Sequence, residues 1–331
     1  MTACPSSICP TTSQITSADR WQHVLARLGY RRDQRRVEPG LYALGQPTPQ
    51  SPVFVTANYK LSFDALREAL AGQDAYILVL NTYGINVWCA AGKGTFGTDE
   101  LVRRIEDVQL HDVVAHRRLI LPQLGAPGVS AHLVKRRSGF SVEYGPVRAA
   151  DLPAYLQAHE ATPAMRLVHF GLADRAVLIP VEAVHTIVPT SIACVVLWLL
   201  GNPLAALGTL AAVLTGVALF PLLLPWLPAR TCTAKGLILG GAVGLAFAAL
   251  AWQAGVQSEP WLRAGRALAL LLALPPVTGY LALNFTGATT FTSRTGVRRE
   301  IARYIPWLVA LFGAGVLMAV AFTIIRLVGG R

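Results

Sequence analysis

Five long apolar runs occupy the second half of the chain. They span residues 186–201, 204–227, 236–254, 265–285 and 305–326. Most approach or exceed the roughly 20 residues that a helix needs to cross a hydrocarbon layer about 30 Å thick. Such runs must be helical, because lipid offers no partner for a free backbone N–H group. The sequence therefore predicts an all-α transmembrane domain at 186–331 with about five helices. The first run is the weakest and can extend upstream to Ala176; four spans remain if it forms an insertion with the second.

Basic residues in the short loops predict the orientation of this domain. The chain has 29 Lys+Arg against 18 Asp+Glu, a formal net charge of +11. The most basic loops carry Arg230, Lys235, Arg294, Arg298, Arg299 and Arg303. The positive-inside rule places these loops in the cytoplasm, and five spans then place the N-terminal half there too. We expect a multi-pass protein of the inner (cytoplasmic) membrane, and topology explains much of the basic excess without nucleic acid as a partner.

The composition of the apolar runs favours an anchor over a transporter. No run carries an acid or base away from its ends, whereas ion pathways and proton relays usually need such groups. Gly236, Gly240 and Gly244 have the small-xxx-small spacing that lets two helices approach closely. Generic membrane-helix glycine is an equally good interpretation of this spacing.

The N-terminal half has the pattern of an α/β domain. We expect a flexible tail at 1–17, a cytoplasmic domain at 18–165 and a linker at 166–185. Predicted strands at 53–57, 76–81, 118–122 and 140–144 alternate with helices at 18–30, 62–70, 99–108, 129–137 and 150–158. This alternation predicts a Rossmann-like, mostly parallel sheet. Ligands on such sheets bind beyond the carboxyl ends of the strands.

One of those strand ends leads into the segment Asn86–Lys93, with the sequence NVWCAAGK. Gly92, Gly94 and Gly97 formally match the dinucleotide pattern G-x-G-x-x-G. The first glycine of that pattern should directly follow the strand, and Gly92 comes well over one helical turn after Asn81. A dinucleotide site is therefore disfavoured.

Two interpretations of Cys89 remain open from pattern alone. A buried core cysteine is the more common case, since free cysteine is often buried. A nucleophile or metal ligand is the other. No C-x-x-C pair or regular histidine cluster accompanies Cys89, which disfavours zinc. A metal that needs one protein ligand would fit, because a macrocycle can supply the others.

The string at 86–93 resembles the signature of the mercury-methylating corrinoid protein family. The wider resemblance covers residues 53–67, 77–101, 119–132 and 144–156. This half is also similar to the corrinoid-binding domain of the corrinoid iron–sulfur protein of the acetyl-CoA pathway. The sequence has membrane helices in place of that protein's barrel domain and cluster-binding cysteines.

The resemblance implies a corrinoid cofactor, cobalamin or a related cobamide, bound base-off with Cys89 as the catalytic lower axial ligand of cobalt. The D-x-H-x-x-G signature of histidine-ligated cobalamin proteins is absent, which fits a thiolate ligand. The cofactor-binding residues that the resemblance implies are Thr56, Ser62, Asn86, Val87, Trp88, Cys89, Ala90, Leu124, Gly125 and Ala126.

The implied activity is methyl transfer from methyl-cobalt(III) to Hg(II), which forms methylmercury. A thiolate is a soft, strongly donating ligand and should favour departure of the methyl group as a carbanion equivalent. The implied methyl donor is methyl-tetrahydrofolate, and the implied electron donor is a small ferredoxin with two [4Fe–4S] clusters. The alternatives are a membrane-anchored corrinoid methyl carrier of one-carbon metabolism and a non-catalytic membrane receptor.

A cluster of arginines precedes the first predicted strand. It comprises Arg31, Arg32, Arg35 and Arg36. This basic patch suits anionic lipid or an acidic ferredoxin. A merely solvated face is an equally good interpretation.

Overall fold

A computed structural model describes residues 8–31, 34–254, 259–288 and 294–329. The chain divides into two compact units, Met1–His169 (unit 1) and Phe170–Arg331 (unit 2). Unit 1 is an α/β domain and unit 2 is helical. We describe each unit by itself.

A mixed sheet forms the centre of unit 1. Among the described residues its six strands are β1 (Ile8–Thr11), β2 (Gly40–Leu44), β3 (Val53–Ala57), β4 (Ala75–Leu80), β5 (Arg118–Leu121) and β6 (Ser141–Tyr144). Their order is β1-β2-β4-β3-β5-β6. Only the β2–β4 pair is antiparallel. The predicted α/β fold with a mostly parallel sheet is confirmed.

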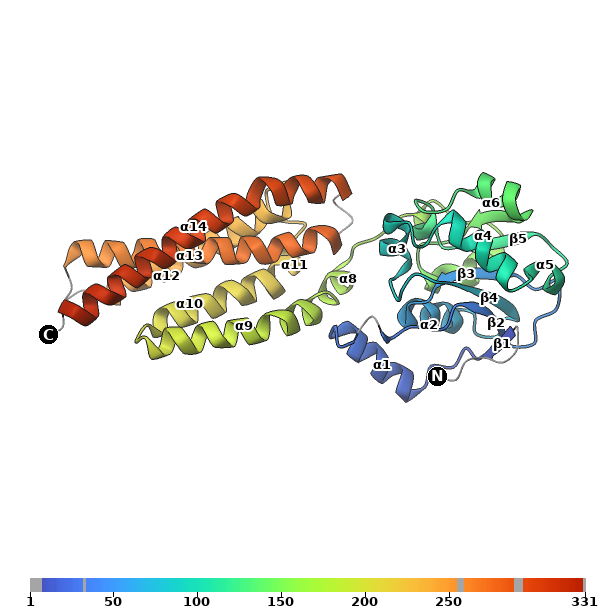
Figure 1. Ribbon diagram of the computed structural model, residues 1–331, viewed down its shortest axis with the longest axis horizontal. Coiled ribbons are helices and arrows are strands. Elements are labelled where there is room, and N and C mark those ends of the chain that lie inside the picture. The colour runs from blue at the N-terminus through green and yellow to red at the C-terminus, as the bar shows by residue number, and fades with distance from the viewer. Residues whose placement is uncertain (1–7, 32–33, 255–258, 289–293, 330–331) are drawn as a thin grey trace. The chain divides into compact units, whose positions relative to one another are not determined.

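Helices cover both faces of this sheet (Figure 1). The described helices of unit 1 are α1 (Ser17–Arg27), α2 (Lys60–Ala69), α3 (Val87–Lys93), α4 (Thr98–Asp107), α5 (Leu110–Val113), α6 (Ala131–Ser138) and α7 (Leu152–Ala158). Side chains of β3 alternate between the faces, as in any strand. Val53 and Val55 join a core with Leu101 of α4, whereas Phe54 joins a second core with Leu66 of α2.

The strand order creates a switch point beside β3. The chain passes from β3 to β4 on one side, then crosses to β5 on the other side of β3. Connections that leave in opposite directions open a crevice at the carboxyl ends of the two strands. The fold thus places a binding crevice between the ends of β3 and β5.

Two strands and one helix start differ from the sequence-based expectation. Strand β1 lies inside the predicted flexible tail, where its Ile8–Thr11 pairs with β2. Both strands carry weak local signals, since β1 contains Pro10 and β2 begins with Gly40, so pairing with neighbours decides their structure. Helix α2 begins at Lys60 rather than after Ser62, and Tyr59 is its N-cap. Residues 1–7 of the predicted tail lie outside the described residues.

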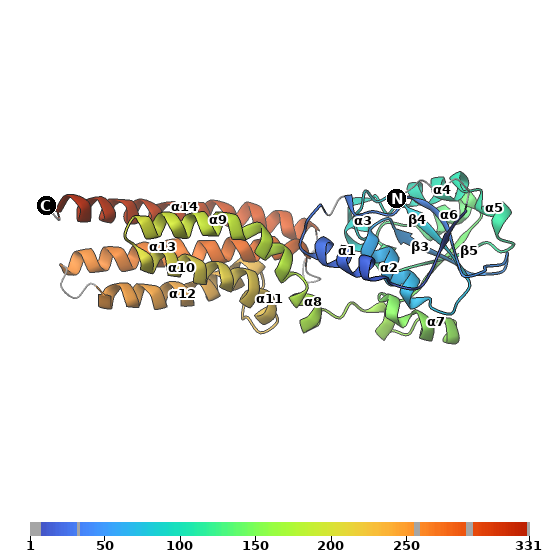
Figure 2. The same ribbon diagram turned by 90° about the horizontal axis from the view of Figure 1, so that it is seen from below.

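Within its described residues, unit 2 contains five helices long and apolar enough to cross a membrane. They span Leu172–Leu199, Pro203–Leu223, Cys232–Ala254, Pro260–Gly287 and Thr295–Ile325. The elements are α8 (Leu172–Ala176), α9 (Ile179–Leu199), α10 (Pro203–Leu214), a π-helical turn (Thr215–Leu219), α11 (Phe220–Leu223), α12 (Cys232–Ala254), α13 (Pro260–Asn284), a 3-10 turn (Phe285–Ala288) and α14 (Arg294–Gly329). The long helices run side by side (Figure 2). These properties are compatible with a multi-pass membrane protein.

The first apolar helix includes the upstream extension that the sequence allowed. Helix α9 starts at Ile179, which lies after Ala176 and inside the segment 166–185 that we expect to be a linker. Glu182 and His185 lower the hydropathy of this segment without opposing a helix, and Pro180 suits a first helical turn. The helix therefore takes up part of the expected linker.

The glycines of α12 bring it against α13. A β-carbon added at Gly236 would lie 2.4 Å from Ala282 Cβ, and one added at Gly240 would lie 2.8 Å from Pro275 Cα. Neither distance leaves room for a side chain. The small-xxx-small spacing therefore serves packing within this chain.

Candidate functional site

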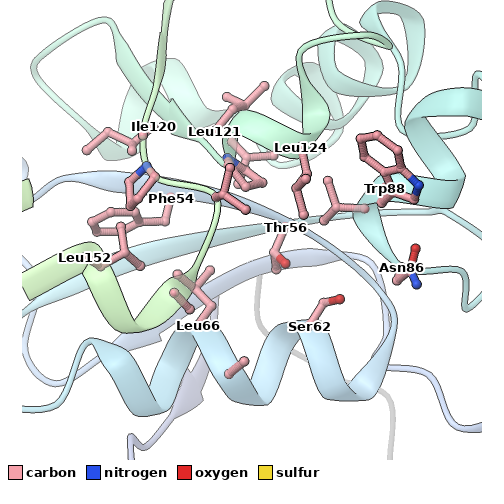
Figure 3. A pocket seen from close by; sticks show the side chains of 18 residues that line it. Phe54, Thr56, Ser62, Leu66, Asn86, Trp88, Ile120, Leu121, Leu124 and Leu152 are labelled. Carbon is pink, nitrogen blue, oxygen red and sulfur yellow. The ribbon is translucent and has the colours of Figure 1, made fainter. Parts of the chain in front are cut away.

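A cavity of about 270 Å³ lies in the crevice at the carboxyl ends of β3 and β5. Its polar side chains, Thr56, Ser62 and Asn86, lie toward one end, and Phe54 and Leu152 lie toward the other (Figure 3). The walls come from β3, α2, the start of α3, the end of β5 and the segment from Gly145 to Leu152. The cavity is thus mainly apolar, with hydrogen-bonding groups near α3.

The loop between β4 and α3 is fixed by one buried amide side chain. Asn58, which follows β3 and is 1% exposed, accepts hydrogen bonds at Oδ1 from the backbone N–H groups of Thr82 (3.0 Å) and Gly84 (2.9 Å). The Thr82 hydroxyl lies 2.9 Å from the same oxygen and 2.7 Å from the Ile85 carbonyl, and it donates to one of them at a time. Tyr83 and Gly84 adopt positive φ angles of 57° and 74°. The backbone turn that leads into α3 therefore depends on Asn58.

A carboxylate holds the other end of this loop. Glu100 Oε1 accepts a hydrogen bond from Asn81 N (2.8 Å), and the carboxylate pairs with Arg103 and Arg104. Burial raises the pKa of Glu100, but the hydrogen bonds from Asn81, Arg103 and Arg104 outweigh it and hold that pKa below its ordinary value. Glu100 therefore accepts as an anion at neutral pH.

Helix α3 presents Cys89 on its outer side. Asn86 caps the helix, and its Oδ1 accepts a hydrogen bond from Cys89 N (2.9 Å). Ala90 and its neighbours Val87 and Ala91 are buried, whereas Trp88 is 40% exposed and Cys89 is partly exposed. Cys89 is a free thiol and belongs to neither core of unit 1. This placement argues against the buried core interpretation of Cys89.

A glycine-rich loop after β5 packs tightly against the residues that follow α3. A β-carbon at Gly128 would lie 2.1 Å from the Phe96 carbonyl oxygen, and one at Gly125 would lie 2.6 Å from the Phe96 ring. The loop includes a 3-10 turn at Gln123–Gly125. This close approach brings Leu124 to the cavity beside Trp88 (Figure 3).

The structure gathers most of the residues singled out from the sequence. Six of them line this one cavity: Thr56, Ser62, Asn86, Val87, Trp88 and Leu124. Cys89 is the next residue of α3 after Trp88. Ala90 faces the core, Gly125 is buried against Phe96, and Ala126 is not among the cavity-lining residues.

Sequence reasoning missed the apolar end of the cavity. Phe54, Leu66, Ile120 and Leu152 line it. The signal available for Phe54 was its spacing of two from Thr56, which puts both side chains on one face of β3.

No cluster of metal ligands accompanies Cys89 in the described ranges. No group of three or more His, Cys, Asp or Glu side chains there could hold a metal ion. Cys89 alone as a donor suits a metal that arrives with most of its ligands already bound.

The glycines that formally match the dinucleotide pattern separate two helices. Gly92 lies inside α3, Gly94 ends that helix with φ 84°, and Gly97 caps α4.

Comparison with known proteins places the similarity in unit 1. Residues 23–155 match the family model of the CO dehydrogenase/acetyl-CoA synthase delta subunit. The acetyl-CoA decarbonylase/synthase complex gamma subunit of Archaeoglobus fulgidus is 32% identical over 124 residues, which are 37% of this chain and 26% of that protein. The gamma subunit of Methanopyrus kandleri is 33% identical over 128 residues, 38% of this chain and 27% of that protein.

A third relative has a corrinoid in its name. The corrinoid/iron-sulfur protein large subunit of Moorella thermoacetica is 27% identical over 157 residues, which are 45% of this chain and 35% of that protein. The chain thus spans about a quarter to a third of the length of these three relatives.

Replacement of Asn58 should loosen the loop that carries α3. Asn58→Ala leaves the N–H groups of Thr82 and Gly84 buried without an acceptor, at about 1–3 kcal/mol each. We expect amide exchange of residues 82–86 to accelerate at least about tenfold, measured by hydrogen-exchange mass spectrometry on the full chain. Asn81→Ala is the matched control, because it removes one exposed acceptor from the same loop. Equal acceleration in both variants would contradict the role of Asn58.

Proposed function

We propose that the chain is a membrane-anchored corrinoid protein that carries methyl groups, with Cys89 as the lower axial ligand of cobalt. The observation that carries this proposal is the free, partly exposed Cys89 of α3, whose three preceding residues, Asn86–Trp88, line the switch-point cavity. The similarity of this same unit to the corrinoid/iron-sulfur protein large subunit and to the gamma subunits supports it.

The residues around the cavity fit such a cofactor. A corrin ring supplies most of the ligands of its cobalt, so one protein donor is sufficient, and a thiolate is a soft donor for it. Asn86, Val87 and Trp88 would support the lower face of the ring, and Thr56, Ser62 and Leu124 would contact it from neighbouring segments. With Cys89 as the lower ligand, we expect the cobamide to bind base-off.

When bound, the corrinoid supplies methyl transfer, and the chain sets the conditions for it. Asn58 and Glu100 fix the loop that precedes α3, and Asn86 fixes the first turn of that helix. The apolar side chains at the cavity would limit the access of water to a group bound there. Removal of water strengthens the electrostatic effect of the donor atom.

The first candidate acceptor lies in one-carbon metabolism. Two relatives are subunits of acetyl-CoA decarbonylase/synthase complexes, and the matching family model describes an acetyl-CoA synthase subunit. We propose a methyl-folate donor, methyl-tetrahydrofolate, and a carbonylating enzyme as the acceptor in this case.

Hg(II) is the second candidate acceptor. The observation that favours it is the string Asn86–Lys93, with its single thiol, which resembles the mercury-methylating family. Electron donation by the Cys89 sulfur would favour transfer of a methyl carbanion equivalent, and Hg(II) is an electrophile that accepts one. We propose a small ferredoxin with two [4Fe–4S] clusters as the electron donor to the corrinoid in this case.

We also propose an orientation for the anchor. The loop with Arg230, the start of α12 with Lys235 and the start of α14 with Arg298, Arg299 and Arg303 would face the cytoplasm of the inner membrane by the positive-inside rule, with unit 1 on the same side. Protease added to intact cells should then leave residues 1–165 uncut, and external cleavage in that range would contradict this orientation.

Cys89→Ala should remove the axial donor without disturbing α3, because alanine is a good helix former. Mutation of a residue that is hydrogen-bonded to a metal ligand typically lowers metal affinity or activity by about 10–100-fold. Loss of the ligand itself should therefore lower the rate of methyl transfer by at least about 100-fold. The absorption spectrum of the bound corrinoid should change as well. Cys194→Ala, in apolar α9, is the matched control and should change neither property. A wild-type spectrum and full activity in Cys89→Ala would refute the axial thiolate.

Methyl transfer from the loaded full chain should separate the two acceptors. The chain is incubated with Hg(II) or with a carbonylating acetyl-CoA synthase, beside free methylcobalamin at equal concentration. Methylmercury formed faster than by free methylcobalamin would identify Hg(II) as the acceptor. Transfer to the synthase alone would identify one-carbon metabolism. Transfer to neither, from a chain that holds cobalt, would contradict the methyl-carrier proposal.

A further inference from the structure

Helix α1 turns an aromatic and basic surface away from unit 1. Trp21 is 61% exposed and Val24 is 45% exposed, and the neighbouring Arg20 and Arg27 are exposed as well. Val24 lies four residues after Arg20 and three residues from both Trp21 and Arg27, so the other three residues surround Val24 on one side of the helix. We call these four residues the outer face of α1.

The opposite side of α1 is fixed to α2 by charged groups. His23 Nε2 lies 2.7 Å from Asp64 Oδ2, and Asp19 Oδ1 accepts from Lys60 Nζ (2.7 Å). Arg67 Nη2 donates to Asp19 Oδ2 (2.9 Å), and its Nε donates to Asp64 Oδ1 (2.7 Å). Asp64 is fully buried, and His23, Lys60 and Arg67 all contact its carboxylate, so this buried charge is well satisfied where α1 meets α2.

This attachment fixes which way α1 faces. Ala26 is buried on the inner side, and the capping box of Thr16 and Asp19 fixes the start of the helix. The helix cannot rotate to bury Trp21 without breaking the ion pairs of Asp19 and the hydrogen bond between His23 and Asp64. The exposure of Trp21 and Val24 is therefore a stable property of unit 1.

The basic surface continues past the end of α1. Tyr30 is 53% exposed, and the guanidinium groups of Arg31 and Arg35 lie 5.5 Å and 5.8 Å from its ring centroid. Stacked arginines keep their charge at the surface beside an aromatic ring. The outer face of α1 and these three residues together join apolar rings to a concentration of positive charge.

We propose that the outer face of α1 lies against the anionic headgroups of a lipid bilayer. The inference rests on the membrane anchoring in the proposed function. Tryptophan and tyrosine are enriched at membrane–water interfaces, where one part of the ring is apolar and the other wet. Arginines near an anionic leaflet are attracted to it.

The chain itself supplies the bilayer. The His169 carbonyl, at the end of unit 1, accepts a hydrogen bond from Arg148, and ten positions further along the chain apolar α9 begins at Ile179. A connection this short holds unit 1 at a high effective concentration near the membrane surface.

The dimensions of the surface favour lipid over a protein partner. A stable protein interface buries about 800 Å² on each side and has a contiguous apolar centre. The outer face of α1 offers two apolar side chains on about two helical turns, flanked by arginines. Headgroups need no complementary shape, and their negative charge matches these arginines.

The test uses the full chain in lipid nanodiscs. Hydrogen-exchange mass spectrometry compares discs of phosphatidylcholine with discs that also contain anionic phosphatidylglycerol. We expect amide exchange of residues 17–31 to be about tenfold slower in the anionic discs, because the attraction of several arginines stabilises the bound helix. High salt should remove most of this difference.

Two surface variants separate the outer face from general charge. Arg20→Glu combined with Arg27→Glu should abolish the difference between the two kinds of disc, and Trp21→Ala should reduce it. Lys135→Glu combined with Arg136→Glu, on the exposed last turn of α6, is the matched control and should retain it.

Three outcomes would overturn the inference. The first is equal exchange of residues 17–31 in both kinds of disc, from a chain that has inserted. The second is slower exchange only after an acidic ferredoxin is added, which would assign the surface to a protein. The third is failure of the chain to enter either kind of disc, which would overturn the membrane anchoring as well. Cobalt binding by unit 1 would be unaffected by any of these three outcomes.

Discussion

The position of the Cys89 thiol depends on the buried amide of Asn58. Two backbone N–H groups of the β4–α3 loop point inward and need an acceptor away from water, and Asn58 Oδ1 provides it. Because Asn58 directly follows β3, it ties the ends of two neighbouring strands together. The geometry of α3 and its cap Asn86 is built on this connection. A loop that would otherwise have many conformations is thereby held in one.

Much of unit 1 could be predicted from its sequence, because its central strands are apolar runs between helices. Strand β3 has the predicted bounds, and the start of α4 differs from its prediction by one residue. Strands β1 and β2 were missed, because short strands with a proline or a glycine gain their structure from pairing that local sequence does not encode. The start of α2 was missed because Ser62 resembles a cap, whereas its side chain lines the cavity.

The candidate site likewise has one part that the sequence indicated and another that it did not. The residues near α3 stood out through the resemblance of the string at 86–93 to the mercury-methylating family, since the pattern alone favoured a buried core cysteine. The apolar end of the cavity did not, because Leu66 and Ile120 are ordinary core residues in the sequence and only the fold leaves space beside them. The role of Asn58 was equally invisible, since asparagine after a strand is typical of any turn.

The tight contact of Gly125 and Gly128 with Phe96 restricts how a ligand can enter the cavity. These atoms leave no clearance, so the loop after β5 and the segment that holds α3 can shift only as one rigid piece. A large planar ligand could not enter by separating these two segments. A change of shape that admits such a ligand would therefore have to come from the other lining segments, among them α2 and the stretch from Gly145 to Leu152.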